Sequence, residues 1–195
     1  MTSKEVLNIV LKDKKYYTAN GGLTVSGGEP LAQSAFTLDL LRIAKENRVH
    51  TCLETSGYAA PEKLLSVVPY VDLFLYDFKE SDEENHKKYT GAEKRLIMDN
   101  LFAIGKTDAK IILRCPIVPT VNERDGHFTA IAETANQLKN IIEINIMPYH
   151  SMGASKAARI GKEYPLSVPD FTEDEKIDNW INKVKMKTSI NVKRG

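Results

Sequence analysis

The sequence predicts an α/β fold in which parallel strands alternate with helices, as in part of a (β/α) barrel. Five short apolar runs each end abruptly in polar residues, and these ends begin at Ser26, Glu54, Asp77, Arg114 and Met147. Their spacing averages roughly 30 residues, the length of one strand-and-helix unit in an eight-unit barrel of about 250 residues. The 195 residues therefore hold about five such units, which we expect to form one domain over residues 1–195.

The first strand is expected at residues 23–25, and it leads into a turn that contains Gly27 and Gly28. Glycine adopts the left-handed backbone of such turns and lets a ligand approach closely. Helical spacing of apolar residues follows this turn. The apolar face of this helix comprises Phe36, Leu40, Ile43 and Ala44.

Four more apolar runs continue the pattern. The second strand ends at Glu54, and the next three are expected at residues 73–76, 111–113 and 142–147. Strands that alternate with helices favour a parallel sheet. The helix before the last of these strands has an apolar face of Phe128, Ile131, Ala132, Ala135 and Leu138.

The two ends of the chain carry further elements. Residues 6–10 indicate an N-terminal helix that no strand precedes, so the barrel pattern starts in mid-repeat. Near the C-terminus, Thr172 and Glu175 predict a capping box for a helix, and residues 190–193 predict a short closing strand. The apolar face of the C-terminal helix comprises Ile177, Trp180, Ile181 and Val184.

Composition narrows the class of protein. Apolar residues make up 42% of the chain and charged residues 27%, which suits one compact domain with a sizeable core. The net charge of +1 gives no electrostatic case for nucleic-acid binding. No apolar stretch reaches the length of a membrane span, and the N-terminus lacks the apolar core of a signal peptide. We expect a cytoplasmic protein that binds neither nucleic acid nor membrane.

The chain has two cysteines, Cys52 and Cys115, each within an apolar run. Their spacing matches neither a zinc knuckle nor a disulfide framework. Because a free cysteine packs as a small hydrophobic side chain, both are expected to be buried and inert. They provide no site for an iron–sulfur cluster.

The polar residues at the strand ends predict a single functional site. In a parallel sheet the loops that follow the strands gather at one edge. Asp77 and Lys79 are two residues apart, so in an extended strand they point to the same face. The residues expected to converge at this edge are Glu29, Glu54, Asp77, Lys79, Arg114 and His150.

Four segments together resemble a known family. Residues 26–30 read Ser-Gly-Gly-Glu-Pro, residues 50–57 include Glu-Thr-Ser-Gly, residues 77–79 read Asp-Phe-Lys, and residues 148–150 read Pro-Tyr-His. In this order and spacing, the chain closely resembles the activating enzymes of glycyl radical enzymes, such as the pyruvate formate-lyase activating enzyme, in the radical S-adenosylmethionine (SAM) superfamily. The resemblance implies a six-unit partial barrel with its active site at the carboxyl-terminal mouth.

The resemblance also implies a reaction. An intact relative uses a [4Fe–4S] cluster and SAM to form a 5′-deoxyadenosyl radical, which abstracts an α-hydrogen from a glycine of a partner such as pyruvate formate-lyase. Flavodoxin or ferredoxin would supply the electron. The family's C-x-x-x-C-x-x-C loop does not occur in this chain. We therefore interpret the chain as a domain truncated at its N-terminus, without catalytic residues of its own and inactive alone, with the cluster confined to the full-length protein.

By resemblance, several residues would bind SAM. Gly27, Gly28 and Glu29 would hold the methionyl amino group, and Lys79 would pair with the methionyl carboxylate. A second group comprises Glu54, Thr55 and Asp77, which would line the mouth and could hold a monovalent cation beside SAM. Relatives usually carry aspartate at the position of Glu54.

The remaining assignments lie near the ends of later strands. By resemblance, Arg114 would reach the SAM carboxylate or ribose, with a barrel salt bridge as the alternative, and His150 would lie near the adenosine. Phe78 belongs to the same SAM-binding motif as its two neighbours. Residues 122–126 are interpreted as a solvated connector or as a contact for the partner's glycine loop. The other three histidines, expected on the surface or in loops, are His50, His86 and His127.

Three alternatives remain open at this stage. A lysine at a strand end is also how a Schiff-base aldolase is built on this barrel, with Lys79 as nucleophile and Asp77 as proton shuttle. The chain could also be a non-catalytic module that binds SAM or a partner. A different radical SAM branch, such as activation of ribonucleotide reductase, would share the barrel.

Overall fold

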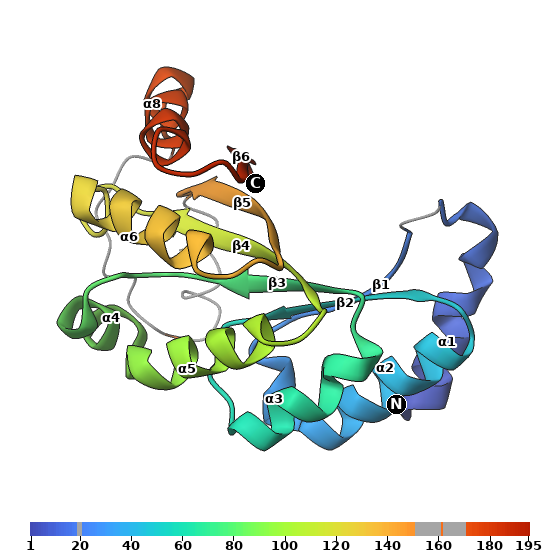
Figure 1. Ribbon diagram of the computed structural model, residues 1–195. Coiled ribbons are helices and arrows are strands. Elements are labelled where there is room, and N and C mark those ends of the chain that lie inside the picture. Colours follow the sequence, from blue (N-terminus) through green and yellow to red (C-terminus); the bar gives the residue numbers. More distant parts are fainter. Residues whose placement is uncertain (19–20, 151–160, 162–170) are drawn as a thin grey trace.

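The computed structural model describes residues 1–18, 21–150, 161 and 171–195, which form an α/β fold (Figure 1). Within them, six strands form one sheet in the order β1-β2-β3-β4-β5-β6, and every neighbouring pair is parallel. This confirms the predicted fold class. The strands are β1 (Gly22–Val25), β2 (His50–Thr55), β3 (Leu73–Asp77), β4 (Lys110–Ile117), β5 (Ile141–Pro148) and β6 (Asn191–Arg194).

Helices connect the successive strands, as the spacing of the apolar runs predicts. Figure 1 shows α2, α3 and α5 side by side along one face of the sheet. In the part of the chain that the structure describes, no helix has the length and apolar character needed to cross a bilayer. The α-helices are α1 (Ser3–Lys12), α2 (Ser34–Glu46), α3 (Pro61–Val67), α4 (Glu83–Thr90), α5 (Lys94–Gly105), α6 (Asp125–Asn136) and α8 (Asp174–Lys185), and the 3-10 helices are η1 (Lys14–Tyr16), η2 (Pro30–Gln33) and η3 (Val68–Tyr70).

The main core lies between the sheet and its helices. Along β4, buried residues alternate with partly exposed ones, because successive side chains of a strand point to opposite faces. The apolar faces predicted for α6 and α8 pack into this core. Leu40, Ile43 and Ala44 of α2 pack instead with Leu7 of α1 in a smaller second cluster. The helix periodicity read from the sequence is therefore confirmed at three helices.

Both cysteines are buried free thiols, as predicted. Cys52 lies in β2 and Cys115 in β4. Burial raises the pKa of each thiol above its usual value. Both side chains therefore serve as packing residues of the sheet.

The two chain ends differ in how their helices begin. At α1 the Thr2 hydroxyl accepts the Glu5 amide and the Glu5 carboxylate accepts the Thr2 amide, which completes a capping box. At α8 the predicted box of Thr172 and Glu175 is wrong. That helix begins at Asp174 after Glu173, and no side chain caps it, so Glu175 is the second helical residue rather than the third.

Two histidines expected on the surface are buried. His86 lies in α4, where its Nδ1 is 2.8 Å from the carbonyl oxygen of Ala92. His127 lies in α6, where its ring stacks on Phe78 with a centroid distance of 5.8 Å. The prediction failed because Nδ1 of each imidazole finds a polar partner inside the fold, which removes part of the cost of burial, although Nε2 of His127 is buried without a partner.

Residues 122–124 are not a solvated connector, whereas Asp125 and Gly126 are exposed as expected. Asn122 is buried, Arg124 turns back toward the β3–α4 loop, and the helix α6 begins at Asp125. Glu123 accepts a hydrogen bond from the indole of Trp180 at 3.0 Å. The polar side chains that suggested solvent exposure are thus satisfied by other elements of the same chain.

Gly57 provides a test of how tightly the loop after β2 is packed. Its φ of +74° suits glycine, and a Cβ there would overlap the hydroxyl of Tyr76. Gly91 has a similar φ of +76° with no atom within 4 Å of the Cβ position. We expect Gly57→Ala to lower the free energy of unfolding by about 2–4 kcal/mol, the sum of backbone strain and overpacking, and Gly91→Ala by about 1 kcal/mol. Urea unfolding measures both, and equal losses would contradict the predicted overlap.

Candidate functional site

The predicted site lies at the edge of the sheet where the strands end. Because all neighbouring strands are parallel, the residues that follow them share this edge. Asp77 at the end of β3 pairs in register with Arg114 of β4, so their side chains start from neighbouring positions. We refer below to this edge, formed by the loops after β1 to β5, as the mouth.

The turn after β1 offers exposed backbone at the mouth. Gly27 and Gly28 have φ values of +95° and +53°, and no atom lies within 4 Å of where either Cβ would be. A side chain at either position would fill this open space. The pair is therefore an exposed turn at which a ligand can approach the main chain closely.

The carboxylate of Glu29 anchors the loop after β2. Its Oε1 accepts hydrogen bonds from the Leu31 amide at 3.2 Å and the Thr55 hydroxyl at 2.7 Å. Its Oε2 accepts the amide and the hydroxyl of Ser56 at 3.0 and 2.7 Å. Four internal donors occupy the acceptor sites of this carboxylate. Glu29 thus connects the turn after β1 to the end of β2 and the loop that follows it, and its negative charge lies at the mouth.

Arg114 is the central cation of the mouth. Its Nη1 lies 2.6 Å from Oε1 of Glu54, and its Nε lies 4.0 Å from Oδ1 of Asp77 and 3.1 Å from the sulfur of Met147. The side chain is 19% exposed, so these contacts are only partly screened by water. One guanidinium therefore links the ends of β2, β3 and β5 to its own strand β4.

Lys79 stands at the outer side of this group. Its Nζ lies 3.4 Å from Oδ2 of Asp77. Burial raises the pKa of Asp77 above its usual value, while Lys79 and Arg114 act in the opposite direction. A small cavity of about 130 Å³ adjoins the pair, and its wall includes Ser56 and His86. The sequence predicts no role at the site for either of these last two residues: Ser56 lies in the Glu-Thr-Ser-Gly segment that follows β2, and His86 lies outside the strand ends.

His150 and Phe78 take different positions. His150 is exposed, and it lines a cavity of about 530 Å³ together with Met147, which also contacts Arg114. The side chain of Phe78 lies in the core, so at most its backbone faces the mouth. The structure thus brings six of the predicted residues to the mouth in two contact groups, places His150 at a neighbouring wall, and turns Phe78 away. The six are Glu29, Glu54, Thr55, Asp77, Lys79 and Arg114.

The residues expected to hold a monovalent cation already have protein partners. Glu54 pairs with Arg114, Asp77 contacts both Arg114 and Lys79, and the Thr55 hydroxyl donates to Glu29. Across the described ranges, no group of three or more His, Cys, Asp or Glu side chains is arranged to hold a metal ion. The cation site stays a prediction.

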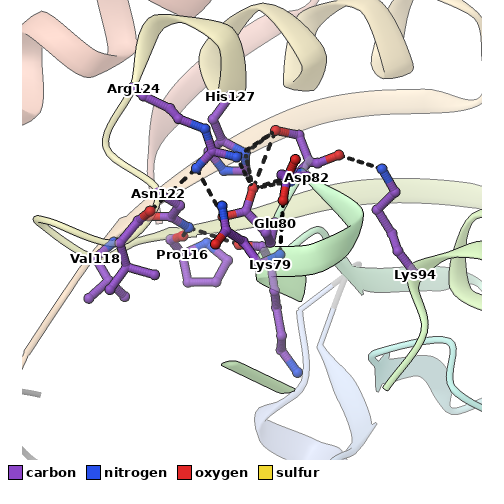
Figure 2. Close-up of polar contacts among 12 residues, drawn as sticks. Lys79, Glu80, Asp82, Lys94, Pro116, Val118, Asn122, Arg124 and His127 are labelled. Carbon is purple, nitrogen blue, oxygen red and sulfur yellow. Dashed lines mark hydrogen bonds and ion pairs between the residues drawn. The ribbon is translucent and has the colours of Figure 1, made fainter. Parts of the chain in front are cut away.

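A second polar network lies just behind the mouth (Figure 2). The buried carboxylate of Glu80 accepts the amides of Ser81 and Asp82 and pairs with both Nη atoms of Arg124. Nδ1 of His127 lies 3.0 Å from the Ser81 hydroxyl. This network joins the loop after β3 to the start of α6. No pattern in the sequence indicates this network beyond the polar character of residues 80–82 and 122–127.

Electrostatics in this network follow from burial. Burial lowers the pKa of His127 to about 4, although Glu80 favours the charged ring. Burial opposes ionisation of Glu80, but the hydrogen bonds from Arg124 and the Asp82 amide outweigh it, and the pKa of Glu80 is lowered. The native network therefore holds a neutral imidazole beside an ionised carboxylate and guanidinium.

Comparison with known proteins gives the chain a family. The model of the radical SAM superfamily matches residues 1–132. The chain is 38% identical over 168 residues to the isethionate sulfite-lyase activating enzyme of Nitratidesulfovibrio vulgaris, which covers 85% of this chain and 54% of that protein. It is 33% identical over 196 residues to the choline trimethylamine-lyase activating enzyme of Oleidesulfovibrio alaskensis, with 97% and 63% covered. The chain thus spans between half and two thirds of the length of these relatives.

Solved structures share the fold. A domain of a pyruvate-formate lyase-activating enzyme from Bacteroides vulgatus superposes with a TM-score of 0.74, covering 90% of this chain and 99% of that domain at 24% identity. Streptococcus suis SuiB bound to S-adenosylmethionine gives a TM-score of 0.73 at 10% identity, covering 100% of this chain and 44% of that one. At these identities the likeness establishes the architecture alone.

Removal of the central cation should destabilise the protein. Arg114→Met leaves two partly buried carboxylates, Glu54 and Asp77, without their shared partner. We expect the free energy of unfolding to fall by about 2 kcal/mol, less than for a fully buried pair because these groups are partly exposed. Arg42→Met is the matched control, since Arg42 pairs with Asp39 and Glu46 on the exposed face of α2 and should change little. Denaturant unfolding that gives the same loss for both variants would contradict the role of Arg114.

The buried His127 should make the fold sensitive to acid. In the unfolded chain this imidazole takes up a proton below its usual pKa of 6.5, whereas in the native state it does so only near 4. Stability is therefore complete above pH 6.5 and falls as the pH drops toward 4, and the lowered pKa of Glu80 extends the loss further. Thermal unfolding at several pH values should show this slope, which His127→Gln should flatten above pH 4.5. The exposed His150→Gln variant should keep it, and an unaltered slope in His127→Gln would refute this origin.

Proposed function

The chain belongs to the radical SAM superfamily, and on that premise we propose that it is the SAM-binding part of an enzyme that activates a glycyl radical enzyme. The superfamily generally uses SAM and a [4Fe–4S] cluster. The relatives of known function with 33 to 38% identity are activating enzymes of glycyl radical enzymes. The observation that carries the proposal is the convergence of two contact groups at the mouth, Glu29 with Thr55, and Arg114 with Glu54 and the Asp77–Lys79 pair.

The residues of the mouth suit the chemistry of SAM. SAM carries a carboxylate, an ammonium, a sulfonium and an adenosine. The open Gly27–Gly28 backbone would receive the methionyl group, and the negative charge of Glu29 would face its ammonium. Because the Glu29 carboxylate already accepts four internal donors, its contribution would be mainly Coulombic. Lys79 would pair with the methionyl carboxylate, and Arg114 would face the carboxylate or ribose through its remaining nitrogens.

The rest of the proposed pocket comes from the last strands. The backbone of Phe78 would line the pocket while its ring stays in the core. His150, exposed beside the larger cavity, would contact the adenosine. Glu54, Thr55 and Asp77 would hold a monovalent cation only if the ligand loosened their pairing with Arg114 and Lys79.

The residues of this chain do not fit a [4Fe–4S] cluster. Such a cluster needs three or four thiolates, and the chain has two cysteines, both buried in strands of the sheet. The proposal therefore assigns the cluster-binding cysteines to sequence beyond residues 1–195. When bound, SAM and the cluster would supply the one-electron chemistry that removes a hydrogen atom from a glycine of the partner. The described residues would hold SAM, balance its charges and exclude water.

The whole protein would act together with a partner enzyme and an electron donor. The partner would be a glycyl radical enzyme of the pyruvate formate-lyase type, and the electron donor a flavodoxin or ferredoxin. A cytoplasmic location would suit that chemistry. These features belong to the whole protein, of which this chain matches a part.

The aldolase alternative has less support. The Lys79 ammonium pairs with Asp77 at 3.4 Å and the side chain is 41% exposed, whereas a nucleophilic lysine is usually desolvated. Reductive trapping with borohydride and a keto substrate would label Lys79 in an aldolase. We expect no label there. A non-catalytic module, the other alternative, would bind SAM without turnover.

Binding of SAM to Glu29 variants tests the proposal. We expect Glu29→Ala to weaken SAM binding to the chain by about 1–3 kcal/mol, the scale of an interaction with a charged group. Ser56→Ala is the control, since it removes one anchor of the loop but keeps the charge of Glu29. Titration calorimetry measures both affinities. Equal losses would show that Glu29 acts only as a loop anchor, and absence of SAM binding to the unaltered chain would refute the proposed function.

A further inference from the structure

A buried asparagine fixes the backbone of Lys79. Asn122 is 2% exposed, and its Nδ2 donates hydrogen bonds of 2.8 Å to the carbonyl oxygens of both Lys79 and Pro116. Its Oδ1 accepts the amide of Val118 at 2.7 Å. A single side chain thus joins the loop after β3 to the end of β4 and the loop that follows it (Figure 2). All these groups would be costly to bury without partners.

The neighbouring Glu80 is held from the same side. Its carboxylate, 3% exposed, pairs with Arg124, which lies two residues after Asn122. Two consecutive residues of the β3–α4 loop are therefore attached to one short segment before α6. Attachment at two successive points restricts rotation of the main chain between them.

Lys79 points the other way. Figure 2 shows its side chain extending away from the network that holds its carbonyl group. The ammonium reaches the mouth, where it is 3.4 Å from Asp77, and the side chain is 41% exposed. A long, half-exposed lysine has considerable rotamer freedom, so its placement depends on a fixed backbone.

We propose that Asn122, supported by the Glu80–Arg124 pair, is a positioning residue that holds Lys79 beside Asp77 so that its ammonium can bind the carboxylate of SAM. The inference rests on the proposed function for the identity of the ligand. The positioning itself rests on the contacts alone. The Asn122 side chain makes no hydrogen bond to a side chain of the mouth, and its contact with Lys79 is to the carbonyl group, so in this proposal its effect passes through the main chain of Lys79.

A matched asparagine separates positioning from stability. Asn140 lies before β5, at the opposite end of the sheet, and its Nδ2 also donates to loop carbonyls, those of Ile104 and Ala109 at 3.2 and 2.6 Å. Asn122→Asp and Asn140→Asp each replace a buried donor by an acceptor facing carbonyl oxygens. Both should lower stability, but only the first should move Lys79.

The first test measures the reactivity of Lys79 without any ligand. Reductive methylation of the chain, followed by mass spectrometry, compares the rate at Lys79 with that at the exposed Lys88 as an internal reference. Pairing with Asp77 slows methylation of Lys79, so Asn122→Asp should raise the rate at Lys79 severalfold and Asn140→Asp should leave it unchanged. Asn122→Ser, which is smaller and introduces no charge, serves if the aspartate variant does not fold. An unchanged rate at Lys79 in a folded Asn122 variant overturns the inference.

The second test is a double-mutant cycle on SAM affinity, measured by calorimetry. Asn122→Asp should weaken binding about tenfold, which corresponds to about 1.4 kcal/mol, and Asn140→Asp should have no such effect. In a Lys79→Met background the Asn122 substitution should add nothing, because the residue through which it acts is gone. Equal weakening with and without Lys79 overturns the inference. A lack of SAM binding to the unaltered chain refutes the proposed function instead. In that case the methylation rates alone show whether Asn122 positions Lys79.

Discussion

The mouth of this protein depends on the Arg114 guanidinium. Parallel strands bring carboxylates from neighbouring loops to one edge, and Glu54 and Asp77 would repel each other there without a cation between them. Arg114 belongs to β4, a strand whose alternate side chains are buried in the core. Packing of this strand therefore sets the position of the cation. Because this cation offsets the two carboxylates, their mutual repulsion does not drive the ends of the neighbouring strands apart.

Behind the mouth, hydrogen bonds from polar side chains hold the loops together, as apolar packing holds the helices against the sheet. Glu29 joins the loops after β1 and β2, and Asn122 joins those after β3 and β4. Both use hydrogen bonds to backbone groups, which the loops would otherwise leave unpaired. These side chains keep the outward-facing charges in place while the loop main chain stays short and partly exposed. Loops held in this way suit a binding site that must be formed before the ligand arrives.

The sequence predicted the architecture and most of the mouth, but not the pairing inside it. Strand ends could be read because each apolar run stops at a polar residue, and parallel order then placed Glu29, Asp77 and Arg114 at one edge. Partners across space could not be read. His127 and Asn122 looked like loop residues because the groups that satisfy them, Ser81 and the Lys79 carbonyl, lie more than forty positions away in the chain. Such pairs follow from the packing of two loops, and no local pattern encodes them.

The charge balance of the mouth bears on the choice of ligand. Three carboxylates, those of Glu29, Glu54 and Asp77, face two cations, Lys79 and Arg114, which leaves one net negative charge when all are ionised. SAM carries an ammonium and a sulfonium against one carboxylate, so it brings one net positive charge. An anionic keto acid would meet repulsion in the same place. Burial raises the pKa of Asp77, and Lys79 and Arg114 oppose that rise, so the two cations proposed to bind the carboxylate of SAM also favour the negative charge that would attract the rest of it.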